Sequence, residues 1–318
     1  MLGKAVDVKI LCAGNNWMRV GSLLAIGLDG YYSELPAGST VAAITGSPGE
    51  MLMNAPRLVA EGNYHMAITT PAWYLKMAVD GKGPFRHSLP LRAIAVFPHD
   101  DRLALAVRKE TGLQRIDDIK ERKYPLKISM PIRELQHPAG WVVEEILKSY
   151  GMTLENIESW GGEILKDLPR FQTSAKSVPI DPKFDAIFDE AIMARRWWRV
   201  SQEYDLTYLK VDESVIASLE NIGMKGGVIE KGRLKGVMED VPTIDFSGWI
   251  LFCREDMPYE LGYLTLKALD EQHENITSIF SQEFSPLTSS VDMLEVGKNT
   301  LVPLHDGVEA YYKEKGYL

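Results

Sequence analysis

The chain has 318 residues, of which 45% are hydrophobic and 25% are charged, and its formal net charge at pH 7 is −9. This length is enough for two lobes with separate cores, and the composition is that of an ordinary globular protein. The acidic balance argues against nucleic acid as a partner, because phosphate binding needs a basic face.

The N-terminal segment favours neither a membrane anchor nor a secretory signal. No apolar run approaches the roughly 20 residues of a membrane span, and residues 1–6 lack the apolar core of about 7–15 residues that a signal needs. Either a signal was removed upstream of this numbering, or the protein is cytoplasmic. Cys12 and Cys253 both fall in strand-like segments, so we expect buried thiols rather than a disulfide.

Strand-like and helix-like segments alternate along the first third of the chain, which favours an α/β fold with mostly parallel sheets. Strands are predicted at residues 7–12, 41–44 and 65–70, and helices from 18 to 29 and from Ser47 onward. Ser47 marks the clearest helix start, because Pro48 suits the first helical position and Glu50 completes a capping box.

The remainder of the chain continues this alternation. Strands are predicted at residues 91–97, 103–107, 126–130, 184–188 and 206–211, and helices at 116–120, 138–150 and 258–281. Residues 243–253 are predicted to return the chain from the second lobe to the first. No internal repeat or low-complexity linker interrupts the pattern.

The last sixteen residues carry the most specific signature. They read Pro-Leu-His-Asp-Gly-Val-Glu-Ala-Tyr-Tyr-Lys-Glu-Lys-Gly-Tyr-Leu, which predicts a turn at Gly307 and a short helix that ends at Gly316. This tail resembles that of the TAXI family, the solute receptors of TRAP-type transporters, in which Pro-Leu-His-Pro-Gly-Ala precedes Tyr-Tyr and an acidic-basic-Gly ending. Asp306 stands where the family has proline. The turn at residues 45–47 and the strand at residues 184–187 resemble family segments as well.

The resemblance extends over nearly the whole chain in the coarse order of its elements. It implies the two-lobed type II periplasmic-binding-protein-like fold, with mixed sheets flanked by helices and a hinged cleft that holds the ligand. Lobe 1 then comprises residues 1–99 and 245–318, and lobe 2 comprises residues 100–244. The resemblance also implies a small, carboxylate-bearing organic acid as ligand, a TRAP membrane permease as partner and a location outside the cytoplasm, with no cofactor.

Side chains at the carboxyl ends of the predicted strands are the candidates for ligand binding, because open α/β sheets bind ligands at that edge. Helix N-termini there offer N–H groups and a positive dipole end to carboxylates, and an aromatic ring can stack on a flat ligand. The competing interpretations are helix capping for Ser47 and core packing for the tryptophans. The candidates are Asn15, Trp17, Thr45, Ser47, Thr69, His137, Asp189 and Trp249.

Two adjacent acids raise a second hypothesis. Asp189 and Glu190 follow the predicted strand at residues 184–188, where carboxylates can bind a cation or act as acid and base. Alternatively, Asp189 is the N-cap of a helix over residues 190–199. The chain is therefore either a receptor or a cytoplasmic enzyme on the same scaffold, a decarboxylase, isomerase or hydrolase of a small acid with Asp189 or Glu190 as base and His137 as acid. A cytoplasmic ligand sensor is a third reading.

Several chemical motifs are missing from the sequence. It has no His-x-Glu, His-x-x-x-His or Cys-x-x-Cys spacing, which argues against a preformed zinc site. It also lacks a Gly-x-Ser-x-Gly nucleophile elbow and a Gly-rich phosphate loop. A solute-binding protein is thus favoured over an enzyme, and the identity of the ligand is left open.

Overall fold

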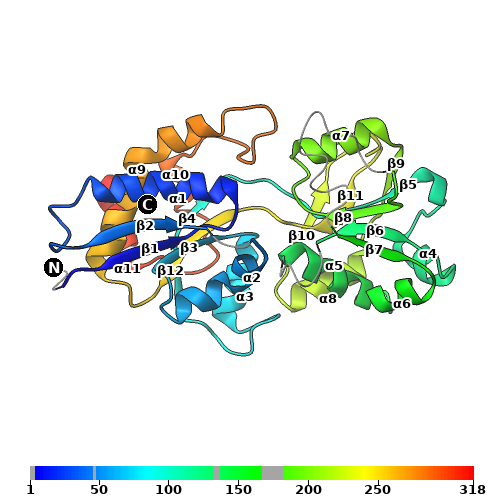
Figure 1. Cartoon of the computed structure of the whole chain (residues 1–318), viewed down its shortest axis with the longest axis horizontal. Helices are drawn as coiled ribbons and strands as arrows, with labels where there is room; N and C mark the ends of the chain where they lie inside the picture. Colours follow the sequence, from blue (N-terminus) through cyan, green and yellow to red (C-terminus); the bar gives the residue numbers. More distant parts are fainter. Residues whose placement is uncertain (1–3, 46–47, 132–136, 167–181) are drawn as a thin grey trace. The chain divides into compact units, whose positions relative to one another are not determined.

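The chain divides into two compact units, each with its own sheet (Figure 1). The computed structural model describes residues 4–45, 48–131, 137–166 and 182–318. Unit 1 comprises Met1–Asp100 and Ser247–Leu318, and unit 2 comprises Asp101–Phe246. Unit 1 is therefore assembled from both ends of the sequence, whereas unit 2 is one continuous segment.

Unit 1 is built on a five-stranded mixed sheet in the order β2-β1-β3-β12-β4. The parallel part consists of β1 (Asp7–Leu11) between β2 (Thr40–Ile44) and β3 (Met66–Thr69). β12 (Trp249–Arg254) runs antiparallel to β3 and to β4 (Leu91–Phe97). Strands β1 to β4 therefore point the same way, and we name the edge at which they end the carboxyl edge of unit 1.

Helices cover both faces of this sheet (Figure 1). α1 (Asn15–Asp29) and α9 (Tyr259–Ile279) lie on one face, where residues such as Val20 and Leu24 share a core with alternating residues of β1 and β3. α2 (Pro48–Ala60) and α3 (Ala72–Asp80) lie on the other. The period-2 alternation of the strands thus supplies an apolar surface to each helix layer.

The tail of the chain forms α11 (Asp306–Lys315), which packs on α9. His305 is its N-cap: the N–H of Gly307 donates to Nδ1 of His305 at 3.3 Å, and Nε2 donates to the carbonyl oxygen of Met257 at 2.7 Å. Gly316 ends the helix with a left-handed φ of 71°. The predicted helix and its end at Gly316 are confirmed, whereas Gly307, the predicted turn residue, lies in the first turn of α11. Asp306 occupies the first helical position, which suits an acid as well as proline, so the exchange preserves the helix start.

Unit 2 holds a second five-stranded sheet in the order β7-β6-β8-β5-β9. β6 (Lys127–Met130) pairs in parallel with β7 (Glu163–Lys166) and β8 (Ala186–Asp189). β5 (Ala104–Arg108) is antiparallel to β8 and to β9 (Leu206–Tyr208). This arrangement repeats that of unit 1. In both sheets the first three strands in spatial order are parallel, the fourth is antiparallel to its neighbours, and the fifth is parallel to the first three.

The helices of unit 2 also cover two faces of their sheet (Figure 1). α7 (Arg195–Glu203) lies on one face, and α5 (Pro138–Ser149) and α8 (Glu213–Asn221) lie on the other. The remaining elements are the antiparallel pair β10 (Gly226–Ile229) and β11 (Val241–Ile244), the short helices α4 (Ile116–Glu121), α6 (Leu154–Ser159) and η1 (Lys109–Thr111), and α10 (Met293–Val296) in unit 1.

The predicted α/β class with mixed sheets flanked by helices is confirmed. The sequence also predicted mostly parallel pairing, and this is wrong. β12 and β5 each run antiparallel to both of their neighbours. α1 begins at Asn15 rather than at residue 18. The segment predicted to return the chain, residues 243–253, contains the end of β11 and most of β12, separated by a turn in which Gly248 has a φ of 85°. The predicted cap residue Ser47 lies outside the described residues.

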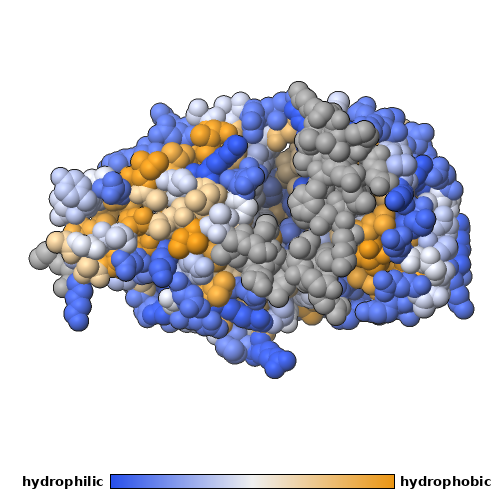
Figure 2. Space-filling view, in the orientation of Figure 1, coloured by the Kyte–Doolittle hydropathy of each residue, from blue (hydrophilic) through white to orange (hydrophobic). Residues whose placement is uncertain are grey.

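Hydrophilic residues occupy most of the face drawn in Figure 2, and hydrophobic residues form smaller patches between them. Among the described ranges, no helix is both long and apolar enough to span a membrane. The many hydrophilic residues on the face in Figure 2 agree with a sequence in which 25% of the residues are charged.

His65 makes the stability of unit 1 depend on pH. The N–H of Lys9 donates to Nδ1 of His65 at 3.2 Å, and burial, with smaller contributions from Lys9 and Arg254, lowers the pKa of His65. Because the folded-state pKa is below the unfolded value of about 6.5, the stabilisation is complete above that pH and is lost as the pH falls through the folded pKa.

Urea unfolding of the wild type and of His65→Gln at pH 7.5 and pH 5 tests this expectation. The difference in free energy of unfolding between the two proteins should shrink at the lower pH. A difference that stays constant, or grows on acidification, contradicts the role of the neutral imidazole.

Candidate functional site

The carboxyl edge of unit 1 presents the N-terminus of α1. The chain leaves β1 and enters the helix through Gly14, whose φ of 84° lies in the left-handed region that glycine tolerates. Within the described ranges, no side chain makes a capping hydrogen bond at the start of α1, whose first N–H groups have no acceptor inside the helix. Asn15, exposed, is the first helical residue. This edge therefore offers a helix N-terminus suited to an anion.

Two threonines flank that helix start. Leu11 at the end of β1 pairs with Ile44 on one side and Ala67 on the other, so Thr45 and Thr69 follow the two neighbouring strands at the same edge. Thr45 is exposed. Thr69 is 0% exposed, and its Oγ1 has no hydrogen-bond partner within residues 4–45, 48–131, 137–166 and 182–318. Such a buried hydroxyl is unusual, because buried polar groups are almost always paired.

Trp17 and Trp249 lie in the core of unit 1. Their ring centroids are 6.0 Å apart in an edge-to-face arrangement, and Trp249 also contacts Phe280 at 5.8 Å and His99 at 4.9 Å. Both tryptophans are less than 6% exposed. These contacts favour the packing interpretation over stacking on a ligand.

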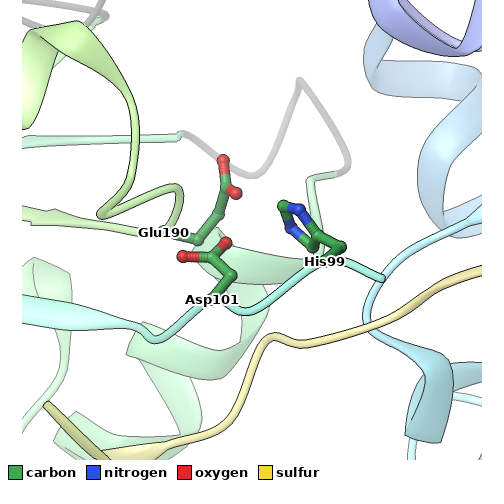
Figure 3. A group of neighbouring side chains, drawn as sticks. All are labelled: His99, Asp101 and Glu190. Atoms are coloured by element: carbon green, nitrogen blue, oxygen red, sulfur yellow. The ribbon is translucent and has the colours of Figure 1, made fainter. Parts of the chain in front are cut away.

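Unit 2 gathers charged side chains at the end of β8. Asp189 is 1% exposed and Glu190 is 8% exposed. Nη2 of Arg196 lies 3.2 Å from both carboxylates. An oxygen of Asp101 lies within 4.8 Å of an oxygen of Glu190. Figure 3 labels both side chains. His99, also labelled there, stands two residues before Asp101 and belongs to unit 1. The structure thus places three carboxylates and a guanidinium together inside unit 2.

Asp101 shapes the loop that follows β8. Its carboxylate accepts hydrogen bonds from the N–H groups of Ala191 at 2.8 Å and Ile192 at 2.9 Å. Ala191 has a φ of 61°, which is incompatible with a right-handed helix. α7 therefore begins at Arg195, and the predicted helix over residues 190–199 with Asp189 as its N-cap is wrong.

His137 is the N-cap of α5. The N–H of Ala139 donates to its Nδ1 at 3.2 Å, so the neutral imidazole carries its proton on Nε2. Nε2 lies 3.9 Å from Oε1 of Glu190, which is longer than a direct hydrogen bond. The structure therefore brings together His137 and Glu190, which the enzyme hypothesis pairs as acid and base.

Neither cysteine has the surroundings of a nucleophile. Both are buried free thiols, as predicted. Burial raises the pKa of Cys12 to about 12 and also raises the pKa of Cys253. A thiol with so high a pKa is not ionised near neutral pH, so both cysteines serve packing.

Sequence reasoning missed Asp101 and Arg196. The sequence places Asp101 in a turn and Arg196 in a basic run on a helix, and both patterns are more often solvent-exposed. Their partners lie far away in sequence or in a loop, so no local spacing reveals them. A buried acid pair such as Asp189 and Glu190 requires a nearby cation. That requirement is the one property that could have pointed to an arginine such as Arg196.

Comparison with known proteins supplies the family. The model of the NMT1-like family matches residues 33–316, whereas no curated protein matches significantly. A Xanthomonas citri protein bound to chloride ion has 9% sequence identity and a TM-score of 0.50, over 97% of this chain and 99% of that chain, and shares the fold. A TctC solute binding protein from Polaromonas has 13% identity and a TM-score of 0.47, over 100% and 99% of the chains. A TRAP periplasmic solute binding protein from Pseudomonas aeruginosa with bound L-malate has 11% identity and a TM-score of 0.40, over 85% and 84%. Because the family model spans most of the sequence, the chain belongs to the NMT1-like family.

Proposed function

We propose that the chain is a TAXI-type solute receptor that binds a small carboxylate-bearing acid outside the cytoplasm and delivers it to a TRAP membrane permease. The observation that supports this most is the buried hydroxyl of Thr69, without a partner in the described part of the chain, at the edge where α1 begins uncapped. The tail and the family membership agree with the proposal.

The chemistry of this edge suits a carboxylate. N–H groups of the first turn of α1 and the positive end of its dipole attract the anion. A buried hydroxyl without a partner costs about 1–3 kcal/mol, so a hydrogen bond from Thr69 to the ligand recovers that energy on binding. Asn15 and Thr45 supply further polar groups at the same edge. Ser47, the remaining candidate here, lies outside the described residues.

The proposed mechanism is hinge closure. The two crossings near residues 98–102 and 240–245 bend, and the ligand favours the closed state only as far as it binds that state more tightly than the open one. His137 and Asp189 would then provide contacts from unit 2. His137 stands at the start of α5 and Asp189 ends β8, and both lie beside the charged side chains of that unit.

Thr69→Val tests the binding role, since it removes one hydroxyl and nearly preserves the side-chain shape. Affinity for L-malate or succinate, measured by titration calorimetry, should fall about 10-fold, equivalent to about 1.4 kcal/mol. Thermal stability should not fall, because the Thr69 hydroxyl has no hydrogen-bond partner to lose among the described residues. The matched control is Thr265→Val: Thr265 is equally buried, but its hydroxyl already donates to the carbonyl oxygen of Leu261 at 2.7 Å. Equal affinities in both variants would contradict the proposal.

A cytoplasmic enzyme is the second candidate, and the proximity of His137 to Glu190 favours it. Non-denaturing mass spectrometry of the natively purified protein separates the two. A co-purified acid, one per chain and recovered unchanged, supports the receptor. Conversion of added acids, abolished by Glu190→Gln, supports the enzyme.

A further inference from the structure

Unit 1 contains a cavity of about 590 Å³ that none of the candidate ligand-binding residues lines. It is lined by the last turn of α2 and by the loop between α3 and β4, at residues 57–61 and 84–90. This volume falls in the range of about 300–1,000 Å³ that is typical of small-ligand pockets. The cavity therefore has the size of a binding site.

The topology places this cavity at the amino edge of the sheet. α2 and α3 both start at the carboxyl edge, after β2 and β3, and run back to the other edge. Their C-terminal ends, Ala60 and Asp80, precede the cavity loop and the start of β4 at Leu91. The cavity and the Thr69 hydroxyl thus lie at opposite edges of one sheet.

The cavity is basic in an otherwise acidic chain. Arg57, Arg86 and His87 line it, and Glu61 is its one carboxylate. Nη2 of Arg57 donates to the carbonyl oxygen of Pro84 at 2.8 Å. Neither Arg57 nor Arg86 forms an ion pair with any residue that the structure describes. Two guanidinium charges therefore face a concave surface without a carboxylate bound to them.

Apolar groups complete the lining. Phe85 is buried, its ring centroid lies 5.2 Å from that of Tyr74, and the guanidinium carbon of Arg57 lies 5.4 Å from its centroid. The ring and the carbonyl oxygen of Pro84 hold Arg57 in place, which lowers the entropy that a ligand contact would cost. Guanidinium groups bind carboxylates and phosphates through two parallel N–H donors.

We propose that this cavity is a second ligand site, for a small organic anion with two or more acidic groups, such as a tricarboxylate or a phosphate ester. The two arginines bind the acidic groups, and the carbon skeleton packs beside Phe85. The site is separate from the proposed solute site, and its existence does not depend on the receptor role.

Titration with citrate at low ionic strength tests the proposal. Amide chemical-shift changes in isotope-labelled protein should concentrate at residues 57–62 and 81–90, with one citrate bound per chain. Arg86→Glu should weaken citrate binding at least 10-fold and should not unfold the protein, because Arg86 is exposed and its side chain makes no hydrogen bond to any residue that the structure describes. Raising the salt concentration should weaken binding further.

Lys231→Glu in unit 2 is the matched control, since it changes the net charge equally at another exposed position. It should leave the citrate affinity read from the shifts at residues 57–62 and 81–90 unchanged. Shift changes scattered over the chain, or equal losses in Arg86→Glu and Lys231→Glu, would overturn the second site. That outcome would leave a Thr69-dependent affinity for malate unaffected, so the two proposals fail independently.

Discussion

Arg196→Met is expected to destabilise the protein by about 3–5 kcal/mol, the typical cost of removing one partner from a buried ion pair. Arg196 contacts both Asp189 and Glu190, which are nearly inaccessible to water. Without the guanidinium, two carboxylates remain close together in a medium of low polarity, and neither is stabilised by hydration. Urea unfolding at pH 7 measures the loss.

Lys148→Met provides the control for a lost cation. Lys148 pairs with Glu145 on the exposed surface of α5, and such pairs contribute about 0–1 kcal/mol. A combined Arg196→Met, Glu190→Gln variant should recover part of the stability, because one buried charge is removed together with its partner. A loss below about 1 kcal/mol in the single variant would show that other groups stabilise these acids.

Gly307→Ala is expected to cost about 3 kcal/mol, at the upper end of the range for an overpacked core. A Cβ atom at Gly307 would lie 2.0 Å from the carbonyl oxygen of Tyr259 and 3.0 Å from the nitrogen of Tyr263. Both are backbone atoms of α9, so no side chain can rotate away and α11 must shift. Thermal unfolding should show a lower midpoint.

Gly316→Ala is the matched control at the other end of α11. Gly316 has a φ of 71°, and no atom lies within 4 Å of the position of its Cβ. The substitution therefore carries only the left-handed backbone strain, about 1–2 kcal/mol. If Gly307→Ala were no more harmful than Gly316→Ala, the close packing of α11 on α9 would be refuted.

The elements that the sequence predicted well are those with local signals. α11 is bounded by a histidine cap and Gly316, and α5 begins at Pro138 directly after a capping His137. Such signals act within one helical turn, so they can be read without knowing the rest of the fold. α3 was missed because nearly all of its residues are apolar and only Lys76 and Asp80 mark a polar face, so its amphipathic period is weak.

The candidate site was less predictable, because its contacts join residues far apart in the chain. The predicted helix after Asp189 failed because Asp101, 90 residues earlier than Ala191, accepts hydrogen bonds from the N–H groups that an Asp189 cap would have bound. Likewise, the hydroxyl of Thr69 gains significance only from its burial, and a sequence gives no burial for one polar residue at a strand end. The predicted ligand contacts of Asn15, Thr45, Trp17 and Trp249 stay predictions.

The internal position of β12 in the first sheet has a consequence for synthesis on the ribosome. β12 lies between β3 and β4, yet it is translated only after the whole of unit 2. All strands of unit 2 are available once Phe246 has left the ribosome. The sheet of unit 1 lacks β12 until residue 254 has followed. Domains commonly complete folding from the N-terminus onward. Here unit 2 can complete its sheet first, although its translation begins later. Until β12 emerges, β3 has an unpaired edge, and such edges promote aggregation.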